Sequence, residues 1–530
     1  MNLVGVLYFF QALWAFPDFT SMTKSSSSGH HLFNISQFYV PSLPDGPPLP
    51  SSWAGRLPVP GAPKGNEIFF WLFDTEDPMY DDNLIIWFNG GPGCSSLVGL
   101  TTGNGPISFA GNSTQIVRNH YSWTKLGHVL YVDQPVGTGF STASNPYPVR
   151  TNERVTTDFV QWLQAFMSYF PHLKSKQLHL MGESYAGIYI PYFAAALLEG
   201  NYSLPLNLQS MSLGDGSWGN AAAMSSVAIG SYINSQSSRL KVTADVLSAF
   251  SSADQMCDFT NVLEQARTYP PKGKIHIPGN PENLNYRRRQ RRDVASVLDD
   301  SCDIQPSTPA AVTKSILNST CYGPCATYST AMDYVSTISA AGSGPACYDV
   351  YDISHNCSTI DPLPLLATYY SRADVQAALH VRNNGPYSAC NSTILGTLLT
   401  APSPVPPEYS ILPSLVTTHN ISLHLYNGEL DMLINHIGTE LSIQNMTWRG
   451  GQGFSRKPHR LFYADDAAPP PQRTAALSSS TDAAEPVGTW ASERGVSYHL
   501  FKGAGHSVFA TKQREMFAFV RDVVVGAKAQ

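Results

Sequence analysis

The 530-residue chain predicts an α/β fold with a largely parallel, doubly wound sheet. Short apolar runs, typical of buried strands, alternate with segments whose apolar residues recur at helical spacing. Hydrophobic residues make up 43% of the chain, which is enough for a large core, and the strand and helix signals are spread evenly. One elaborated domain is therefore expected in preference to three small ones.

The apolar runs predict seven strands, at residues 67–73, 84–88, 128–132, 178–181, 210–213, 422–426 and 496–501. A helix is predicted over 156–170, between the third and fourth strands, and another over 189–200, directly after the fourth. From about 218 to 370 the strand signals stop and the cysteines cluster. This stretch is expected to be an inserted cap.

The net charge of −6 gives no indication of nucleic-acid binding. The one basic cluster lies between Arg287 and Arg292, between a Pro-rich and a polar stretch, and predicts an exposed loop. Cleavage there by a processing protease with dibasic preference is a further hypothesis.

The first sixteen residues form a short apolar run without charge, which predicts a signal peptide over residues 1–18. No later apolar stretch reaches about 18 residues, so no membrane anchor is expected.

Cysteines and glycosylation sequons both favour the secretory pathway. The eight cysteines are an even set, and their spacing suits disulfides better than a metal site. Eight Asn-x-Ser/Thr sequons occur, at Asn34, Asn112, Asn201, Asn318, Asn356, Asn391, Asn420 and Asn445. A secreted or vacuolar protein is expected.

The segment LHLMGESYAGIYI has the pattern of a nucleophile elbow, in which a strand turns sharply into a helix and exposes a serine, here Ser184. Such a turn requires small residues on both sides of the serine, and Gly182 and Ala186 stand there. The elbow presents the serine to a base and to backbone N–H groups that can stabilise an oxyanion.

Two further candidates follow predicted strands, in the order that the α/β-hydrolase fold requires. Asp431 comes after the strand at 422–426, and His506 after the strand at 496–501. We expect Ser184 to attack a carbonyl, His506 to carry the proton, and Asp431 to orient the imidazole and stabilise its charged form.

Several blocks of sequence resemble the serine carboxypeptidase family. They are WFNGGPGCSSL at 87–97, VDQPVGTGFS at 132–141, GESYAG, YNGELD and GAGH, and the resemblance covers about 38–519. It implies an α/β-hydrolase that releases C-terminal residues from peptides and proteins through an acyl-enzyme intermediate, at acidic pH, without metal or organic cofactor. An acyltransferase of the same fold and a catalytically silent binding relative are the alternatives.

The resemblance also implies particular residue roles. The oxyanion donors would be the backbone N–H groups of Gly91 and Tyr185, and two glycines after a strand do allow close approach of the backbone to a substrate. By the same resemblance, Asn89, Glu183 and Trp87 bind the substrate carboxylate, and Cys94 pairs with Cys390. Glu183 would have to be protonated in order to donate to that carboxylate.

The chain departs from the family pattern twice. A second glutamate is usual where this chain has Gly103, and a methionine is usual where it has Ser507. Hydrolysis is expected to survive both changes, with altered selectivity. The predicted organisation is a signal peptide (1–18), the first half of the hydrolase core (19–217), the cap (218–370) and the second half (371–530), with a low-complexity loop at about 464–488.

Overall fold

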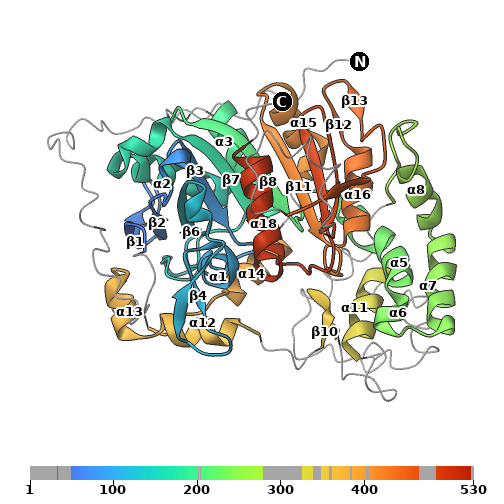
Figure 1. The fold of residues 1–530 in the computed structure, drawn as a ribbon, viewed down its shortest axis with the longest axis horizontal. Helices are drawn as coiled ribbons and strands as arrows, with labels where there is room; N and C mark the ends of the chain where they lie inside the picture. The colour runs from blue at the N-terminus through green and yellow to red at the C-terminus, as the bar shows by residue number, and fades with distance from the viewer. Residues whose placement is uncertain are drawn as a thin grey trace.

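A computed structural model describes residues 33, 49–200, 202, 204–278, 325–337, 348–356, 361–381, 385–401, 405–464 and 485–526. A large twisted sheet forms the centre of the molecule (Figure 1). Its ten strands among the described residues are, in spatial order, β1 (Ser52–Pro58), β2 (Glu67–Phe73), β6 (His128–Asp133), β3 (Asn83–Phe88), β7 (Gln177–Glu183), β8 (Asn207–Gly214), β11 (Ser422–Gly428), β16 (Val496–Phe501), β15 (Gly488–Glu493) and β14 (Arg460–Phe462).

The six strands from β6 to β16 are parallel to their neighbours, and the strands at the two ends of the sheet pair antiparallel. All seven predicted strands are present, so the predicted fold class is confirmed. The sequence prediction missed β1, β14 and β15, which lie at the edges. Because the carboxyl ends of parallel strands meet at one edge of a sheet, the loops after β3, β7, β8, β11 and β16 come together there.

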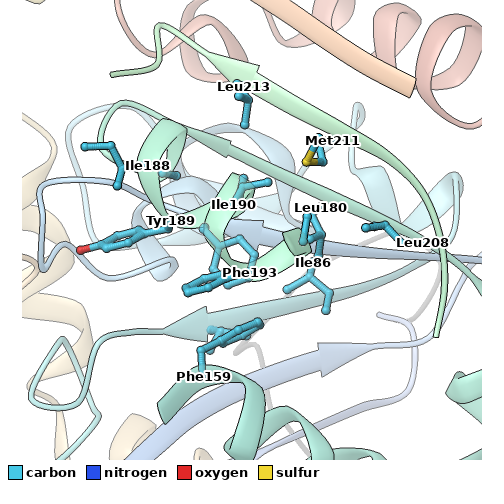
Figure 2. Packing of buried hydrophobic residues seen from close by; sticks show 14 of the residues in the cluster. Ile86, Phe159, Leu180, Ile188, Tyr189, Ile190, Phe193, Leu208, Met211 and Leu213 are labelled. Carbon is cyan, nitrogen blue, oxygen red and sulfur yellow. The ribbon is translucent and has the colours of Figure 1, made fainter. Parts of the chain in front are cut away.

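One face of the sheet is covered by α2 (Asn152–Tyr169), α3 (Ala186–Glu199) and α15 (Ile411–Thr417). Helix α2 begins where the Thr151 hydroxyl accepts a hydrogen bond from the Arg154 N–H (3.3 Å), and ends before Pro171. Figure 2 shows Phe159 of α2 and Phe193 of α3 packed against Ile86 of the sheet.

The opposite face is covered by α12 (Leu363–Tyr370), α17 (Val508–Thr511) and α18 (Gln513–Phe519). Helix α18 crosses in front of the sheet in Figure 1. Strand β2 contributes to both layers, because alternate side chains point to opposite faces: Phe70 packs with α2 and Trp71 with the second layer. Helices on both faces make the sheet doubly wound, as predicted.

The insertion lies beside α16 (His436–Asn445), on the opposite side of the molecule from α2 (Figure 1). It contains α5 (Ser226–Ser235), α6 (Ser237–Leu240), α7 (Ala244–Met256), α8 (Phe259–Ala266), α11 (Thr327–Thr337) and the hairpin of β9 (Tyr348–Asp349) and β10 (Asp352–Asn356). The expectation that strands stop in this region was wrong for the hairpin, which is too short to leave an alternating pattern in the sequence. A core shared by α5, α7, α11 and the hairpin includes Leu430 and Met432, the neighbours of Asp431.

Within the described parts of the chain, no helix has both the length and the apolar character that a membrane crossing needs. The predicted signal peptide, the basic cluster between Arg287 and Arg292, and most of the low-complexity loop lie outside the described residues. The domain boundaries stay predictions.

Replacing Phe159 with alanine should lower the free energy of unfolding by about 3–5 kcal/mol. The ring is fully buried and stacks on Phe193, with 4.1 Å between centroids, so its removal leaves a cavity. Leu399→Ala, at a side chain 46% exposed, is the control and should change stability by no more than about 0.5 kcal/mol. Thermal or denaturant unfolding measures both variants, and equal losses would contradict the packing described.

Candidate active site

The turn between β7 and α3 holds Ser184 in an unusual backbone conformation. Its φ is +59°, in the left-handed region that residues with a side chain rarely adopt. Hydrogen bonds on both sides of the residue maintain this strain: the Ser184 N–H donates to Gly214 O (2.9 Å), and the Ser184 carbonyl accepts from Gly187 N (2.9 Å) and Ser217 N (3.0 Å). The conformation is that of a nucleophile elbow, with the serine partly exposed.

The elbow leaves no room for larger residues beside the serine. A Cβ atom at Gly182 would lie 2.5 Å from Phe88 O and 2.7 Å from the Ala186 Cβ. Gly90, in the loop after β3, approaches from the other side, where a Cβ would lie 2.5 Å from the Tyr185 N. The small residues that the sequence pattern singled out are thus required by packing.

Asp431 and His506 are brought together from the loops after β11 and β16. His506 Nδ1 lies 2.8 Å from Asp431 Oδ2, and both side chains are buried. The other carboxylate oxygen, Oδ1, accepts hydrogen bonds from Leu433 N (2.8 Å) and Ile434 N (3.3 Å). These bonds hold the carboxylate in one orientation toward the imidazole.

Burial lowers the pKa of His506, but the charge and hydrogen bond of Asp431 outweigh that effect and leave the pKa above its usual 6.5. The imidazole is therefore a stronger base than a free one. The Ser184 hydroxyl has no hydrogen-bond partner among the residues that the structure describes. Glu183, the residue before Ser184, interacts electrostatically with both His506 and Asp431, which places the elbow beside the pair.

Two backbone N–H groups at the elbow are available to an oxyanion. Gly91 has φ +103°, a conformation that favours glycine. Within the described part of the chain, neither the Gly91 N–H nor the Tyr185 N–H donates a hydrogen bond. These are the two donors that the sequence analysis proposed.

The Gly-rich loop after β3 is braced by the second sequence block, residues 132–141. Asp133, fully buried at the end of β6, accepts hydrogen bonds from Ser95 Oγ (2.6 Å), Ser96 N (3.0 Å) and Phe140 N (2.9 Å). Burial raises the pKa of Asp133 to about 6, while these three donors act to lower it. The two blocks are therefore a single hydrogen-bonded unit.

A disulfide between Cys94 and Cys390 anchors the same loop, and it is the pairing that the resemblance implied. Backbone hydrogen bonds flank it, from Ser95 N to Ala389 O (2.7 Å) and from Asn391 N to Gly93 O (3.0 Å). A second disulfide, Cys257–Cys325, joins α7 to α11 in the insertion. The sequence analysis left this second pairing open, and the remaining four cysteines lie outside the described residues.

Asn89 and Glu183 form a buried pair beside the elbow. Asn89 Nδ2 donates to Glu183 Oε1 (2.7 Å), and Asn89 Oδ1 accepts from Trp87 Nε1 (2.8 Å) and Gly99 N (3.0 Å). These contacts fix which end of the Asn89 amide is the donor. Trp87 is fully buried, so its part is to orient Asn89.

Burial raises the pKa of Glu183 to about 7, although His506, Ser507 and Asn89 act to lower it. The second oxygen, Glu183 Oε2, is buried without a hydrogen-bond partner among the described residues. A buried oxygen without a partner is costly unless it carries a proton or a ligand pairs with it. The pair can therefore present two donors, one from Asn89 and one from protonated Glu183.

The structure shows the surroundings of the two positions at which the chain departs from the family pattern. A Cβ at Gly103 would lie 2.2 Å from Phe509 O, so the main chain of α17 occupies the space that a glutamate side chain would need. Ser507, just before α17, lies close enough to Glu183 for its hydroxyl to favour the ionised form. The Ser507 hydroxyl therefore lies near Glu183, in a chain that has glycine and not a second glutamate at position 103.

The sequence analysis missed two residues at the site, Tyr351 and Asp215. Tyr351, in the β9–β10 turn, is 52% exposed, and its ring packs edge-on against His506 with 5.2 Å between centroids. Its carbonyl accepts from His506 N (2.7 Å). Nothing in the sequence relates this position to His506. Asp215, by contrast, lies two residues after the predicted strand at 210–213, a signal that could have found it.

Comparison with known proteins places the chain in one family. Residues 44–526 match the family described as serine carboxypeptidase. A carboxypeptidase Y homolog of Arthroderma benhamiae is 44% identical over 512 residues, which cover 95% of this chain and 96% of that protein. A pheromone-processing carboxypeptidase kex1 of Talaromyces marneffei is 29% identical, over 91% of this chain and 68% of the other.

The fold is that of a solved relative. The crystal structure of Kex1(delta)p, a prohormone-processing carboxypeptidase from Saccharomyces cerevisiae, matches with a TM-score of 0.68 and 21% identity. The match covers 93% of this chain and 96% of that one. The large central sheet and its helices are thus shared with that enzyme.

Replacing Asp133 with alanine should destabilise the Gly-rich loop, because three donors in a buried site would lose their acceptor. Each unsatisfied donor costs about 1–3 kcal/mol. Asp133→Asn, which keeps one acceptor oxygen, should lose less than Asp133→Ala. Calorimetric unfolding of the two variants would show the difference. If Asp133→Ala were as stable as the wild type, the hydrogen bonds of Asp133 would not stabilise the Gly-rich loop.

Proposed function

The chain belongs to the serine carboxypeptidase family and is a serine-type carboxypeptidase, and on that basis we propose that Ser184, His506 and Asp431 are its catalytic triad. The observation that carries this assignment is the buried Asp431–His506 hydrogen bond of 2.8 Å beside the strained elbow at Ser184. The order of the three residues along the chain also agrees with the α/β-hydrolase pattern.

In the first half of the reaction, Ser184 Oγ attacks the carbonyl carbon of the last peptide bond while His506 Nε2 takes the hydroxyl proton. The oxyanion that forms accepts hydrogen bonds from the N–H groups of Gly91 and Tyr185. His506 then gives its proton to the leaving amine. The C–N bond breaks, the C-terminal amino acid departs, and the remaining peptide stays as an ester on Ser184.

In the second half, a water molecule attacks the ester, and His506 takes a proton from it. The proton returns to Ser184 Oγ as the ester bond breaks, which releases the shortened peptide and restores the enzyme. Asp431 stays ionised throughout. It holds the imidazole tautomer and stabilises its positive charge in both halves.

The free carboxylate of the substrate is bound, in this proposal, by Asn89 Nδ2 and by the proton on Glu183 Oε2. Asn89 is oriented by Trp87 and Gly99, and Glu183 Oε2 lacks any other described partner. This recognition requires Glu183 to be protonated. We therefore propose that peptide hydrolysis favours acidic pH and weakens as pH rises through about 7, where Glu183 loses its proton.

The proposal places the protein in the secretory pathway, either secreted or vacuolar. Two disulfides in the described residues support this, since such bonds persist in oxidising compartments. Of the sequon residues that the structure describes, Asn112 and Asn420 are exposed, whereas the Asn391 amide nitrogen donates to Gly137 O (2.9 Å). We propose that Asn112 carries a glycan. Processing between Arg287 and Arg292 stays a hypothesis.

Ser184→Ala should reduce kcat by about 10⁶, because the triad acts as a unit. Ser168→Ala, at an exposed serine of α2, is the control and should retain full activity. Release of the C-terminal residue, followed by mass spectrometry, measures both. In the wild-type enzyme, an ester substrate should give a burst of the first product. A fully active Ser184→Ala variant would overturn the mechanism.

Glu183→Gln should abolish the loss of peptide hydrolysis above about pH 7. In the wild type, KM for peptides should rise as pH rises through about 7, the pKa to which burial raises Glu183, because the ionised carboxylate repels the substrate carboxylate. Glutamine is a donor at every pH, so this alkaline limb should disappear. Glu153→Gln, at an exposed residue of α2, should keep it. If the loss of peptide hydrolysis above about pH 7 persisted in Glu183→Gln, it would arise from the titration of another group.

A further inference from the structure

Asp215 is a fully buried carboxyl group that the proposed mechanism does not use. It directly follows β8, at the edge of the sheet where the active site lies, and has φ +41°. Its N–H donates to Tyr426 O (2.9 Å). Its Oδ1 accepts from Asn427 Nδ2 and from Gly428 N, both at 3.0 Å. One oxygen of Asp215 is thus fully engaged.

The other oxygen, Asp215 Oδ2, has no N–H or O–H donor among the described residues. Ligand atoms of Asp215, Asp431 and His506 all lie within 4.8 Å of one another. Asp431 itself is occupied, by Leu433 N and Ile434 N on Oδ1 and by His506 on Oδ2. Two carboxyl groups therefore lie close together in a buried place.

Two negative charges so close together in a buried site repel strongly, so one of the carboxyl groups must hold a proton. Asp431 is the better site for the charge, because two backbone N–H groups and the imidazole donate to it. Asp215 receives donors on one oxygen only. A proton on the other oxygen of Asp215, Oδ2, would have the Asp431 carboxylate as its hydrogen-bond acceptor.

We propose that Asp215 is a neutral carboxylic acid that donates a hydrogen bond from Oδ2 to the Asp431 carboxylate and so positions the acid of the triad. Asp215 is a positioning residue, since it acts on the substrate only through Asp431 and His506. The inference rests on the proposed triad.

The electrostatic surroundings agree with a neutral Asp215. Burial, followed by the charge of Asp431, raises the pKa of Asp215 well above its usual 3.8, and among the described residues no lysine or arginine acts on it. Other titratable groups act electrostatically on Asp215 or Asp431 from the neighbouring strands, helices and loops. They are Tyr426 on β11, Tyr498 on β16, Tyr232 on α5, His436 on α16, Tyr351 in the hairpin turn, and Glu183 and His506 at the site. A tyrosine carries no positive charge in either form, and burial lowers the pKa of His436 to about 4, so neither the tyrosines nor His436 supply a positive charge to Asp215 near neutral pH.

The test compares Asp215→Ala with Asp215→Asn in the intact protein. The alanine variant removes the donor to Asp431 and the acceptor of Gly428 N and of one Asn427 N–H, while Asn427 Nδ2 keeps its bond to Ile434 O (3.0 Å). It should lose about 10–100-fold in kcat with little change in KM, as expected for a hydrogen bond to a charged group. Asparagine reproduces the neutral acid, with an oxygen toward Asn427 and an N–H toward Asp431, and should restore kcat to near the wild-type value.

The pH profile separates a neutral from a charged Asp215. With an ester substrate in the Glu183→Gln background, the acid limb of kcat/KM reports the titration of His506. If Asp215 is neutral, Asp215→Asn should leave this limb in place. If Asp215 is charged, the variant removes a negative charge near His506 and should shift the limb down by about one unit or more, which would overturn the proposal.

Infrared difference spectroscopy tests the proton itself and does not depend on turnover. The wild-type-minus-Asp215→Asn spectrum at neutral pH should show the carbonyl band of a protonated carboxylic acid. A difference that contains only carboxylate bands would refute the proposal. Because this readout needs no catalysis, it tests Asp215 even if Ser184→Ala disproves the mechanism, and it remains decisive if Asp215→Ala fails to fold.

Discussion

The active site depends on one geometric constraint, the left-handed turn at Ser184. The turn is strained, and it exists because β7 and α3 are buried on opposite sides of it and because Gly214, Gly187 and Ser217 hold its backbone groups. The close approach of Gly90 depends on the same turn and brings the Gly-rich loop to the serine. The positions of the two proposed oxyanion donors and of the Asn89–Glu183 pair follow from this approach.

Burial of charged and polar groups explains why the residues of the proposed site are each held by further buried residues behind them. Asp133 braces the Gly-rich loop, Trp87 orients Asn89, and Asp431 meets both His506 and Asp215. Each buried carboxyl is either paired with donors or placed where a proton is favoured, because an unpaired buried charge is too costly. The same burial that secures the geometry therefore also brings the pKa of Glu183 to about 7, which is why the proposed mode of peptide binding depends on the protonation of Glu183.

The sequence predicted the parallel centre of the sheet, the elbow and the order of the three proposed catalytic residues, because buried strands leave long apolar runs and the elbow requires small residues at fixed positions. It could not predict the edge strands β14 and β15, which are short or only partly apolar. Asp215 lies in a Gly-Asp-Gly string typical of an ordinary turn, and only the fold brings it to Asp431. Tyr351 comes from the insertion, whose packing against the loops of Asp431 and His506 is a tertiary property.

The most direct test of the account is digestion of one peptide and its C-terminally amidated twin, at mildly acidic and at neutral pH, with the products followed by mass. The account predicts stepwise loss of residues from the free acid, little attack on the amide, and a smaller preference for the free acid as pH rises through about 7, where Glu183 ionises. Equal attack on both peptides at every pH would contradict carboxylate recognition by Asn89 and Glu183. Transfer of the acyl group to an added alcohol without hydrolysis in water would show an acyltransferase instead.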